Sequence, residues 1–439
     1  MAKKFRRWDV EQRWLLPPSV KELVPDDHPA HFVRDLVRSD LDLSSILDSY
    51  AEERGQPPFH PVMMTALLLY AYTQGIYSSR RIAKACQERV DFMAVTAIQE
   101  ADFRTVNLFR QRHLEALGGL FVQVLRLCRR AGLVRLGHVA LDGSKFKANA
   151  SKHAAMSYKR MREEEARLRA EVQGWLEQAE AVDEAEDAEH GADRRGDEMP
   201  CWVADKEKRL RKIREAKAAL EKEAAEASKA RAEGDDVKAV RVKASGGKPR
   251  ETAQRNFTDP DSKIMRAKGT FEQSYNCQAA VDAGSQVIVA RSVTNKQNDM
   301  RELPSMLVQI RANTGRQTKE LSADVGYCSE DNLRELSRRR VRGYVATGRQ
   351  KHGSSSATGQ RTKGPRARAM AARLKRGGFR SRYRLRKQTV EPVFGQIKEA
   401  RGFRGFLLRG LHKIQAEWSL VCAAHNLLEL MRATATAPT

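Results

Sequence analysis

The sequence changes character at residues 134–146, which read VRLGHVALDGSKF. Val139 and Leu141 are apolar, and Asp142 and Gly143 follow them directly. This pattern predicts a strand that ends in a turn at the acid. Because residues 1–132 have a helical pattern, we expect the strand to open a second domain over residues 133–439.

The pattern after this strand alternates between strands and helices. Strands are expected at residues 271–282 and 286–294, and the short Ala-Gly-Ser segment between them predicts a hairpin. Further patterns predict a helix at residues 303–313, a strand at 320–325, a helix capped by Ser329 and a strand at 342–347. A three-stranded antiparallel unit followed by strand–helix units is the order of an α/β ribonuclease H-like mixed sheet.

A charged insertion interrupts the second domain at residues 155–262. Residues 161–179 and 202–232 are rich in Ala, Glu, Lys and Arg and poor in aromatic residues, which predicts two long helices. A basic linker at residues 234–262 closes the insertion. We interpret the whole segment as a helical hairpin that forms a solvated arm.

Residues 1–132 predict a helical domain that binds DNA. An apolar helix is expected at residues 62–74, and a glycine turn separates it from a second helix that a serine can cap. A basic helix is expected from Phe103. This order suits a helix-turn-helix DNA reader with Arg80 and Arg81 among its contacts. The alternative is an ordinary helical bundle with a solvated basic face.

The chain of 439 residues has 80 Lys and Arg against 56 Asp and Glu, a formal net charge of +24. Such a charge attracts polyanions, of which nucleic acids are the most common. Residues 349–387 contain fourteen basic residues and no acidic one, so we expect them to contact the phosphate backbone and their first half to be mobile.

Several features argue against a membrane or secreted protein. The longest apolar run, residues 62–72, is too short to span a membrane, and the N-terminus lacks the apolar region of a signal peptide. The six cysteines are scattered without zinc-binding spacing, which favours reduced thiols. We therefore expect a cytoplasmic protein, associated with the nucleoid when it binds DNA.

Three acids occupy positions where such a fold brings carboxylates together. Asp142 ends the first strand, Asp324 ends the strand after the first helix, and Glu391 lies in a later helix. The two strands lie side by side in this sheet, and apolar neighbours make an unpaired acid costly there. Oxygen ligands favour magnesium or manganese over zinc. Two such ions can clamp the attacking and leaving oxygens of a phosphodiester.

Five segments closely resemble the DDE transposases of bacterial insertion sequences, and most of all the branch with a helical N-terminal domain and an insertion in the catalytic core. They occur in the family's order and span most of the chain. Residues 56–82 resemble its N-terminal domain and residues 274–282, SYNCQAAVD, its second strand. The segments of its catalytic acids are matched by residues 141–145 (LDGSK), 323–327 (ADVGY) and 390–398 (VEPVFGQIK).

The family often places Tyr, Arg and Lys at fixed spacings around its Glu. The corresponding positions and their neighbours hold Tyr383, Arg384, Arg386, Lys387 and Lys398. We expect the four basic residues of this set to bind DNA, with Lys398 on the same helix face as Glu391. Pro392 predicts that the helix either starts near Glu391 or kinks there.

The resemblance implies a transposase. A metal-activated water would cut one strand at the element's end, and the freed 3′-hydroxyl would attack another phosphodiester without a covalent enzyme intermediate. Two Mg²⁺ (or Mn²⁺) ions are implied, with Asp142 bridging them, Asp324 on one and Glu391 on the other. Double-stranded DNA, from element ends and target, is the implied partner. We expect a homodimer on DNA, because two ends must be held together.

Two other functions stay open, a metal-dependent nuclease of the same fold and a catalytically inactive DNA-binding protein. Asp299 follows a strand and could support the pocket, but a turn or capping residue ahead of the next helix is the favoured interpretation. His425 and Asn426 lie in an apolar helix, where we expect a hydrogen-bonded core pair.

Overall fold

A computed structural model gives the fold of most of the chain. It describes residues 19, 22, 24–50, 58–190, 201–232, 247–267, 270–348 and 364–435. The segment predicted to be mobile falls largely on residues 349–363, which lie outside the described residues.

The N-terminal region is helical, as predicted. Its described helices are α1 (Pro29–Ser39), α2 (Ser44–Leu47), α3 (Pro61–Thr73), α4 (Ser79–Glu88), α5 (Val90–Thr96), α6 (Phe103–Arg112) and α7 (Leu114–Arg130). The apolar α3 is buried over almost its whole length. The single basic helix expected from Phe103 is divided at His113, which ends α6 and whose ring lies 3.1 Å from the Tyr50 hydroxyl.

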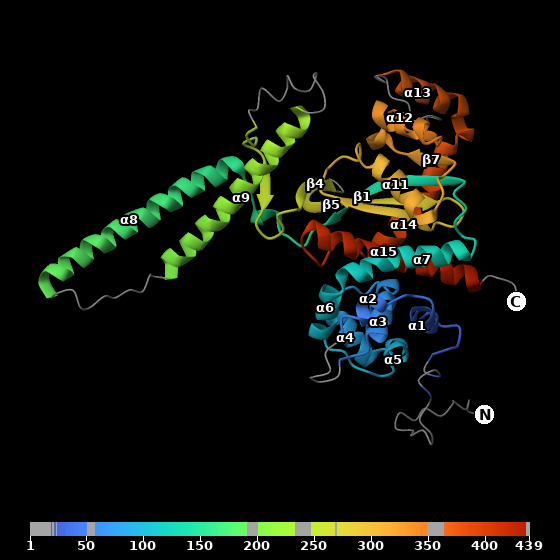
Figure 1. Cartoon of the computed structure of the whole chain (residues 1–439), viewed down its shortest axis with the longest axis horizontal. Coiled ribbons are helices and arrows are strands. Elements are labelled where there is room, and N and C mark those ends of the chain that lie inside the picture. Colours follow the sequence, from blue (N-terminus) through green and yellow to red (C-terminus); the bar gives the residue numbers. More distant parts are fainter. Residues whose placement is uncertain are drawn as a thin grey trace, which may run out of the picture.

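A mixed sheet forms the centre of the second region (Figure 1). Its strands are β1 (His138–Lys147), β4 (Lys263–Ala267), β5 (Thr270–Asp282), β6 (Ile288–Thr294), β7 (Glu320–Ala323) and β8 (Arg342–Val345). The strand order is β4-β5-β1-β7-β8, and β6 pairs with β5 beside β4. The pairs β1–β5, β4–β5 and β5–β6 are antiparallel, whereas β1–β7 and β7–β8 are parallel. The predicted ribonuclease H-like sheet is therefore confirmed.

Helices connect and cover these strands. They are α11 (Leu303–Thr314), α12 (Glu330–Arg338), α13 (Pro365–Gly377), α14 (Leu385–Gly395) and α15 (Leu411–Ala435). Pro304 lies in the first turn of α11, where its missing N–H costs nothing. The hydroxyl of Ser329 accepts a hydrogen bond from the Asn332 N–H at 3.1 Å and caps α12, as predicted.

Helix α15 links the sheet to the helical region. Figure 1 shows α7 and α15 lying together between the sheet and helices α1 to α6. His425 and Asn426 are fully buried, and Asn426 hydrogen-bonds both the N–H and the carbonyl of Ile288. His425 Nε2 lies 2.9 Å from the Gln286 carbonyl. The predicted core pair is confirmed, and one buried apolar cluster runs through both regions.

The insertion is a long two-helix arm, as predicted. Helices α8 (Tyr158–His190) and α9 (Cys201–Ala232) project from the body in Figure 1. Their base is a two-stranded sheet of β2 (Ala155–Ser157) and β3 (Gln254–Asn256). A separate apolar cluster joins the two helices, with Met161, Leu168, Ile213 and Leu220 buried in it.

Some expectations were wrong in detail. Strand β1 continues to Lys147 and does not end at Asp142, because β5 keeps pairing with it through Ser274. The expected linker at residues 234–262 contains β3. Helix α14 begins at Leu385 and runs through Pro392, so it does not start near Glu391. In the described part of the chain, every helix is too short or too polar to span a bilayer.

Candidate active site

Strand pairing places Asp142 beside Asp324. The last parallel pair between β1 and β7 is Leu141 with Ala323, and each acid directly follows its member of this pair in the sequence. Strand β7 ends at Ala323, whereas β1 continues against β5. The two carboxylates therefore lie at the same level of two neighbouring strands, at the point where β7 ends.

Backbone N–H groups orient these two carboxylates. Asp142 Oδ1 accepts a hydrogen bond from the Gly143 N–H at 2.9 Å. Asp324 Oδ1 accepts one from the Gly326 N–H, also at 2.9 Å, and so caps the short 3₁₀ turn Val325–Tyr327. Each bond fixes one oxygen of the acid and leaves the other free to meet a cation or another residue.

Arg386 connects Asp142 to Glu391. One guanidinium nitrogen, NH1, donates to Asp142 Oδ2 at 2.5 Å, and the other, NH2, donates to Glu391 Oε1 at 2.9 Å. The side chains of Arg386 and Asp142 are 12% and 16% exposed, whereas that of Glu391 is 46% exposed. Arg386 and Glu391, both on α14, thus lie next to Asp142 of β1. A single cation, Arg386, holds two of the three predicted acids together.

Burial makes this a place where negative charge is unfavourable. It raises the pKa of Asp142 to about 7, with the Asp324 and Glu391 charges acting in the same direction and Arg386 opposing them. Burial also raises the pKa of Asp324, and the carboxylate of Asp299 adds to this effect. A cation that replaced or joined Arg386 would favour the ionised acids.

The donor chemistry fits a hard divalent cation. Asp142, Asp324 and Glu391 offer only oxygen ligands, the set that magnesium and manganese prefer. As the described side chains stand, no three His, Cys, Asp or Glu residues converge closely enough to hold a metal ion. The guanidinium of Arg386 lies between two of the acids instead. Displacement of Arg386 would leave the acids with a net negative charge that a divalent cation could neutralise.

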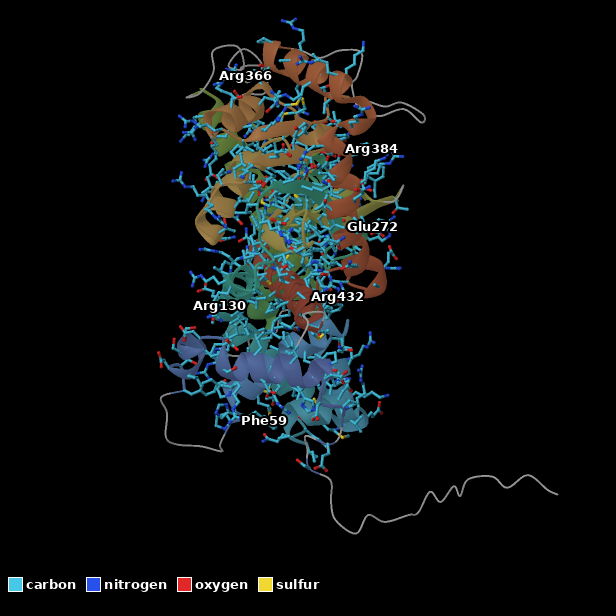
Figure 2. The ribbon with its side chains drawn as sticks, turned by 90° about the vertical axis from the view of Figure 1, so that its right-hand side faces the viewer. Phe59, Arg130, Glu272, Arg366, Arg384 and Arg432 are labelled. Atoms are coloured by element: carbon cyan, nitrogen blue, oxygen red, sulfur yellow. The ribbon has the colours of Figure 1, made fainter. Side chains whose placement is uncertain are left out.

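The structure distinguishes among the basic residues around Glu391. Lys398 lies in a π-helical turn, Gln396–Ala400, and its Nζ donates to Ser144 Oγ at 2.6 Å and to the Lys145 carbonyl at 2.7 Å. Lys387 and Arg384 are exposed, and Figure 2 shows Arg384 at the outer surface. Among the positions near the expected spacing, Arg386 rather than Lys387 reaches the acids.

Arg80 and Arg81 lie elsewhere, on the exposed face of α4. The Arg80 guanidinium stacks 5.3 Å from the centre of the Phe103 ring, and that of Arg104 lies 5.7 Å from the same ring. In Figure 1, α4 and α6 are on the far side of α7 and α15 from the sheet. These arginines therefore form a second basic surface, separate from the acids.

Sequence reasoning gave too little weight to Asn276, Gln278 and Asp299. Strand β5 aligns Gln278 with Gly143 of β1, and the two amides both donate to Asp299 Oδ1 at 2.6 Å. The available signal was the alternation of polar residues in SYNCQAAVD, since Asn276 and Gln278 share one face of a strand. The apolar residues of that strand made it look like an ordinary core strand, so the alternation of polar residues was not used.

Comparison with known families supports the same assignment. Residues 18–112 match the family described as Transposase domain (DUF772), and residues 237–427 match the family described as Transposase DDE domain. Asp324 and Glu391 lie inside the second range, and Asp142 lies between the two ranges. Neither the curated proteins nor the solved structures provide a match. With both transposase regions present in succession around a ribonuclease H-like sheet, the chain belongs to the DDE transposases of insertion sequences.

Proposed function

We propose that this transposase cuts DNA at the ends of its insertion sequence and joins the freed 3′ ends to target DNA, with Asp142, Asp324 and Glu391 as its catalytic carboxylates. The observation that carries the proposal is the parallel register of β1 and β7, which sets Asp142 beside Asp324, together with the Arg386 bridge to Glu391.

Each acid has a defined task in this proposal. Two Mg²⁺ or Mn²⁺ ions, when bound, activate the attacking hydroxyl and neutralise charge that develops on the phosphate. Asp142, Asp324 and Glu391 would hold these ions, with Asp142 as their common ligand. When no metal ion is bound, Arg386 keeps Asp142 and Glu391 close together. Once released from Asp142, its guanidinium can bind a DNA phosphate, since Arg pairs with phosphate as well as with carboxylate.

The basic side chains position double-stranded DNA in the proposal. Lys398, Lys387, Arg384 and Arg386 would bind the phosphates next to the scissile bond. Arg80 and Arg81, on the helical region, would hold a more distant part of the element end. We propose a homodimer on DNA, because transposition requires two ends to be held together, and action on cytoplasmic DNA at the nucleoid.

Strand transfer in vitro tests the proposal. Purified protein is incubated with a labelled duplex of the element end, a target plasmid and Mg²⁺. The Asp142→Asn protein is compared with Asp331→Asn, which removes the same charge from a side chain that is 80% exposed on α12. We expect joined product from the wild type and from Asp331→Asn, and at least a ~100-fold loss in Asp142→Asn, as for removal of a group that stabilises the transition state directly.

Other outcomes identify the alternatives. Nicked DNA without joined product would indicate a nuclease of the same fold. DNA retention with equal inactivity of wild type and Asp142→Asn would indicate a DNA-binding protein without catalysis. Equal joining by wild type and Asp142→Asn would remove Asp142 from the catalytic set.

A further inference from the structure

The side chain of Asp299 lies between Gly143 of β1 and Gly326 of the turn that follows Asp324. A Cβ atom added to Gly143 would be 2.7 Å from Asp299 Oδ1. A Cβ atom added to Gly326 would be 3.2 Å from Asp299 Oδ2 and 3.0 Å from Asp324 Oδ1. Asp299 and Asp324 thus direct oxygens to the same point, and only the absence of a Cβ on both glycines leaves room for them.

Two buried amides fix the orientation of Asp299. Asn276 Nδ2 and Gln278 Nε2 each donate to Asp299 Oδ1 at 2.6 Å. The buried Tyr327 hydroxyl donates to Gln278 Oε1, which forces the Gln278 amide to present its nitrogen to Asp299. Because Oδ1 accepts both amides, Oδ2 is the oxygen left to face Asp324.

The Asp299 side chain does not cap α11. Its contact with that helix is through its backbone carbonyl, which accepts a hydrogen bond from the Glu302 N–H at 3.0 Å. Residue Glu302 is the N-cap, without a side-chain hydrogen bond to the helix. The turn interpretation therefore accounts for the backbone of Asp299 and leaves its carboxylate unexplained.

The side-chain oxygen of Asn276, a neighbour of Asp299, lacks a hydrogen-bond partner among the described residues. Asn276 is fully buried, and within the described residues its Oδ1 accepts no hydrogen bond. This oxygen lies 3.1 Å from the position of a Cβ on Gly143. A buried acceptor without a donor is unfavourable. A cation, or water bound to a cation, would satisfy it.

The charges around Asp299 point the same way. The carboxylate faces the like charge of Asp324, and the nearest cation on β1 is Lys145. Lys145 Nζ donates to the Gln297 carbonyl at 2.8 Å, and Arg386 is taken up by Asp142 and Glu391. Lys145 acts on both carboxylates and Arg386 acts on Asp324, so these two cations offset part of the negative charge that a divalent ion would neutralise.

We propose that Asp299 is a fourth cation-binding carboxylate of the active site, sharing with Asp324 the divalent ion held there. Asn276, Gln278 and Tyr327 are its positioning residues. The inference rests on the proposed function, because it assigns a further ligand to the same metal-dependent site.

Mn²⁺ binding tests the inference without recourse to activity. Free Mn²⁺ is measured by electron paramagnetic resonance in titrations of wild type, Asp299→Asn, Asp142→Asn and the exposed control Asp331→Asn. We expect Asp299→Asn to bind Mn²⁺ at least ~10-fold more weakly than wild type and Asp331→Asn. Without metal, Asp299→Asn should unfold at the same or a higher temperature than wild type, because its repulsion with Asp324 is gone.

The outcomes separate the inference from the function on which it rests. If Asp299→Asn and wild type bind Mn²⁺ equally while Asp142→Asn binds weakly, the inference is wrong and the proposed function stands. If wild type binds no Mn²⁺, both are wrong. A large drop in unfolding temperature with unchanged Mn²⁺ affinity would make Asp299 a purely structural residue. Asp299→Ser, which is smaller, repeats the test should Asp299→Asn fail to fold.

Discussion

In the proposed mechanism, Arg386 and a divalent cation would compete for the same oxygens of Asp142 and Glu391. The guanidinium already satisfies Asp142 Oδ2 and Glu391 Oε1, and it is largely buried with them. Removing one partner from a buried ion pair costs more than the pair contributes, because a charge is left without a partner. In the proposed mechanism, Arg386 would therefore keep Asp142 and Glu391 together until a metal ion and a DNA phosphate replace the two sides of the pair.

The raised pKa of Asp142 predicts an unusual pH dependence. Its ordinary value is 3.8 and burial raises it to about 7, so between these values the native state binds more protons than the unfolded state. Its contribution to the free energy of unfolding is therefore full below pH about 4. It falls by up to about 4 kcal/mol as the pH rises to about 7.

Urea unfolding with a metal chelator checks this prediction. Asp142→Asn cannot ionise, so its stability relative to wild type should increase from pH 4 to pH 7 and become constant above. The comparison cancels the groups that titrate in both proteins. A stability difference that does not change with pH would mean that Asp142 titrates normally in the folded chain.

The sequence was informative about single residues where the reasoning followed strand order. The side-by-side placement of Asp142 and Asp324 follows from which strands are neighbours, and the register confirms it. Their catalytic roles stay a prediction. Arg386 was only one of four basic candidates near Glu391, because a count along an ideal helix cannot say which side chain faces the sheet once Pro392 and a π-helical turn alter the helix.

At the scale of elements, long-range pairing decided what local patterns could not. The Gly143–Ser144 dipeptide looks like a turn, yet β1 continues through it because β5 provides a partner for every residue up to Lys147. The short strands β2 and β3 have no strand-like pattern of their own and exist by pairing with each other. The long helices α8 and α9, whose pattern is local, were predicted correctly.

Substitution of Gly143 tests whether strand β1 needs a residue without a side chain at this position. A Cβ there would lie 2.5 Å from Gln278 Nε2 and 2.7 Å from Asp299 Oδ1, so Gly143→Ala must displace the amides that hold Asp299. We expect a loss of about 1–3 kcal/mol in the free energy of unfolding, and weaker Mn²⁺ binding. Gly137→Ala, just ahead of the same strand, is the control because nothing lies within 4 Å of its added Cβ. Equal denaturation midpoints for the two variants would contradict the prediction.

At the scale of the molecule, the described residues form two apolar cores of different extent. The larger runs from the N-terminal helices through α7 and α15 into the sheet. Helix α15 lies between the helical region and the sheet and packs against both. The smaller belongs to the arm alone and joins α8 to α9. Composition identified the arm as an insertion. The role of α15 was not predictable, because it depends on packing between segments almost three hundred residues apart, such as Cys128 and Asn426.

Separate cores predict that the arm can be removed without unfolding the body. Ser157 and Gln254 are cross-strand neighbours in the β2–β3 pair, so an Asn-Gly turn can replace residues 158–253 and close the hairpin. The retained base loses the apolar contacts of Met156 and Phe257 with the arm's cluster, and polar contacts such as that of the Arg255 guanidinium with Glu223. Thermal unfolding of the shortened protein should therefore show one cooperative transition within a few degrees of wild type. Loss of that transition would mean that the arm is needed to fold the catalytic sheet. If the transition is retained, the strand-transfer assay can measure what the arm contributes to DNA binding and joining.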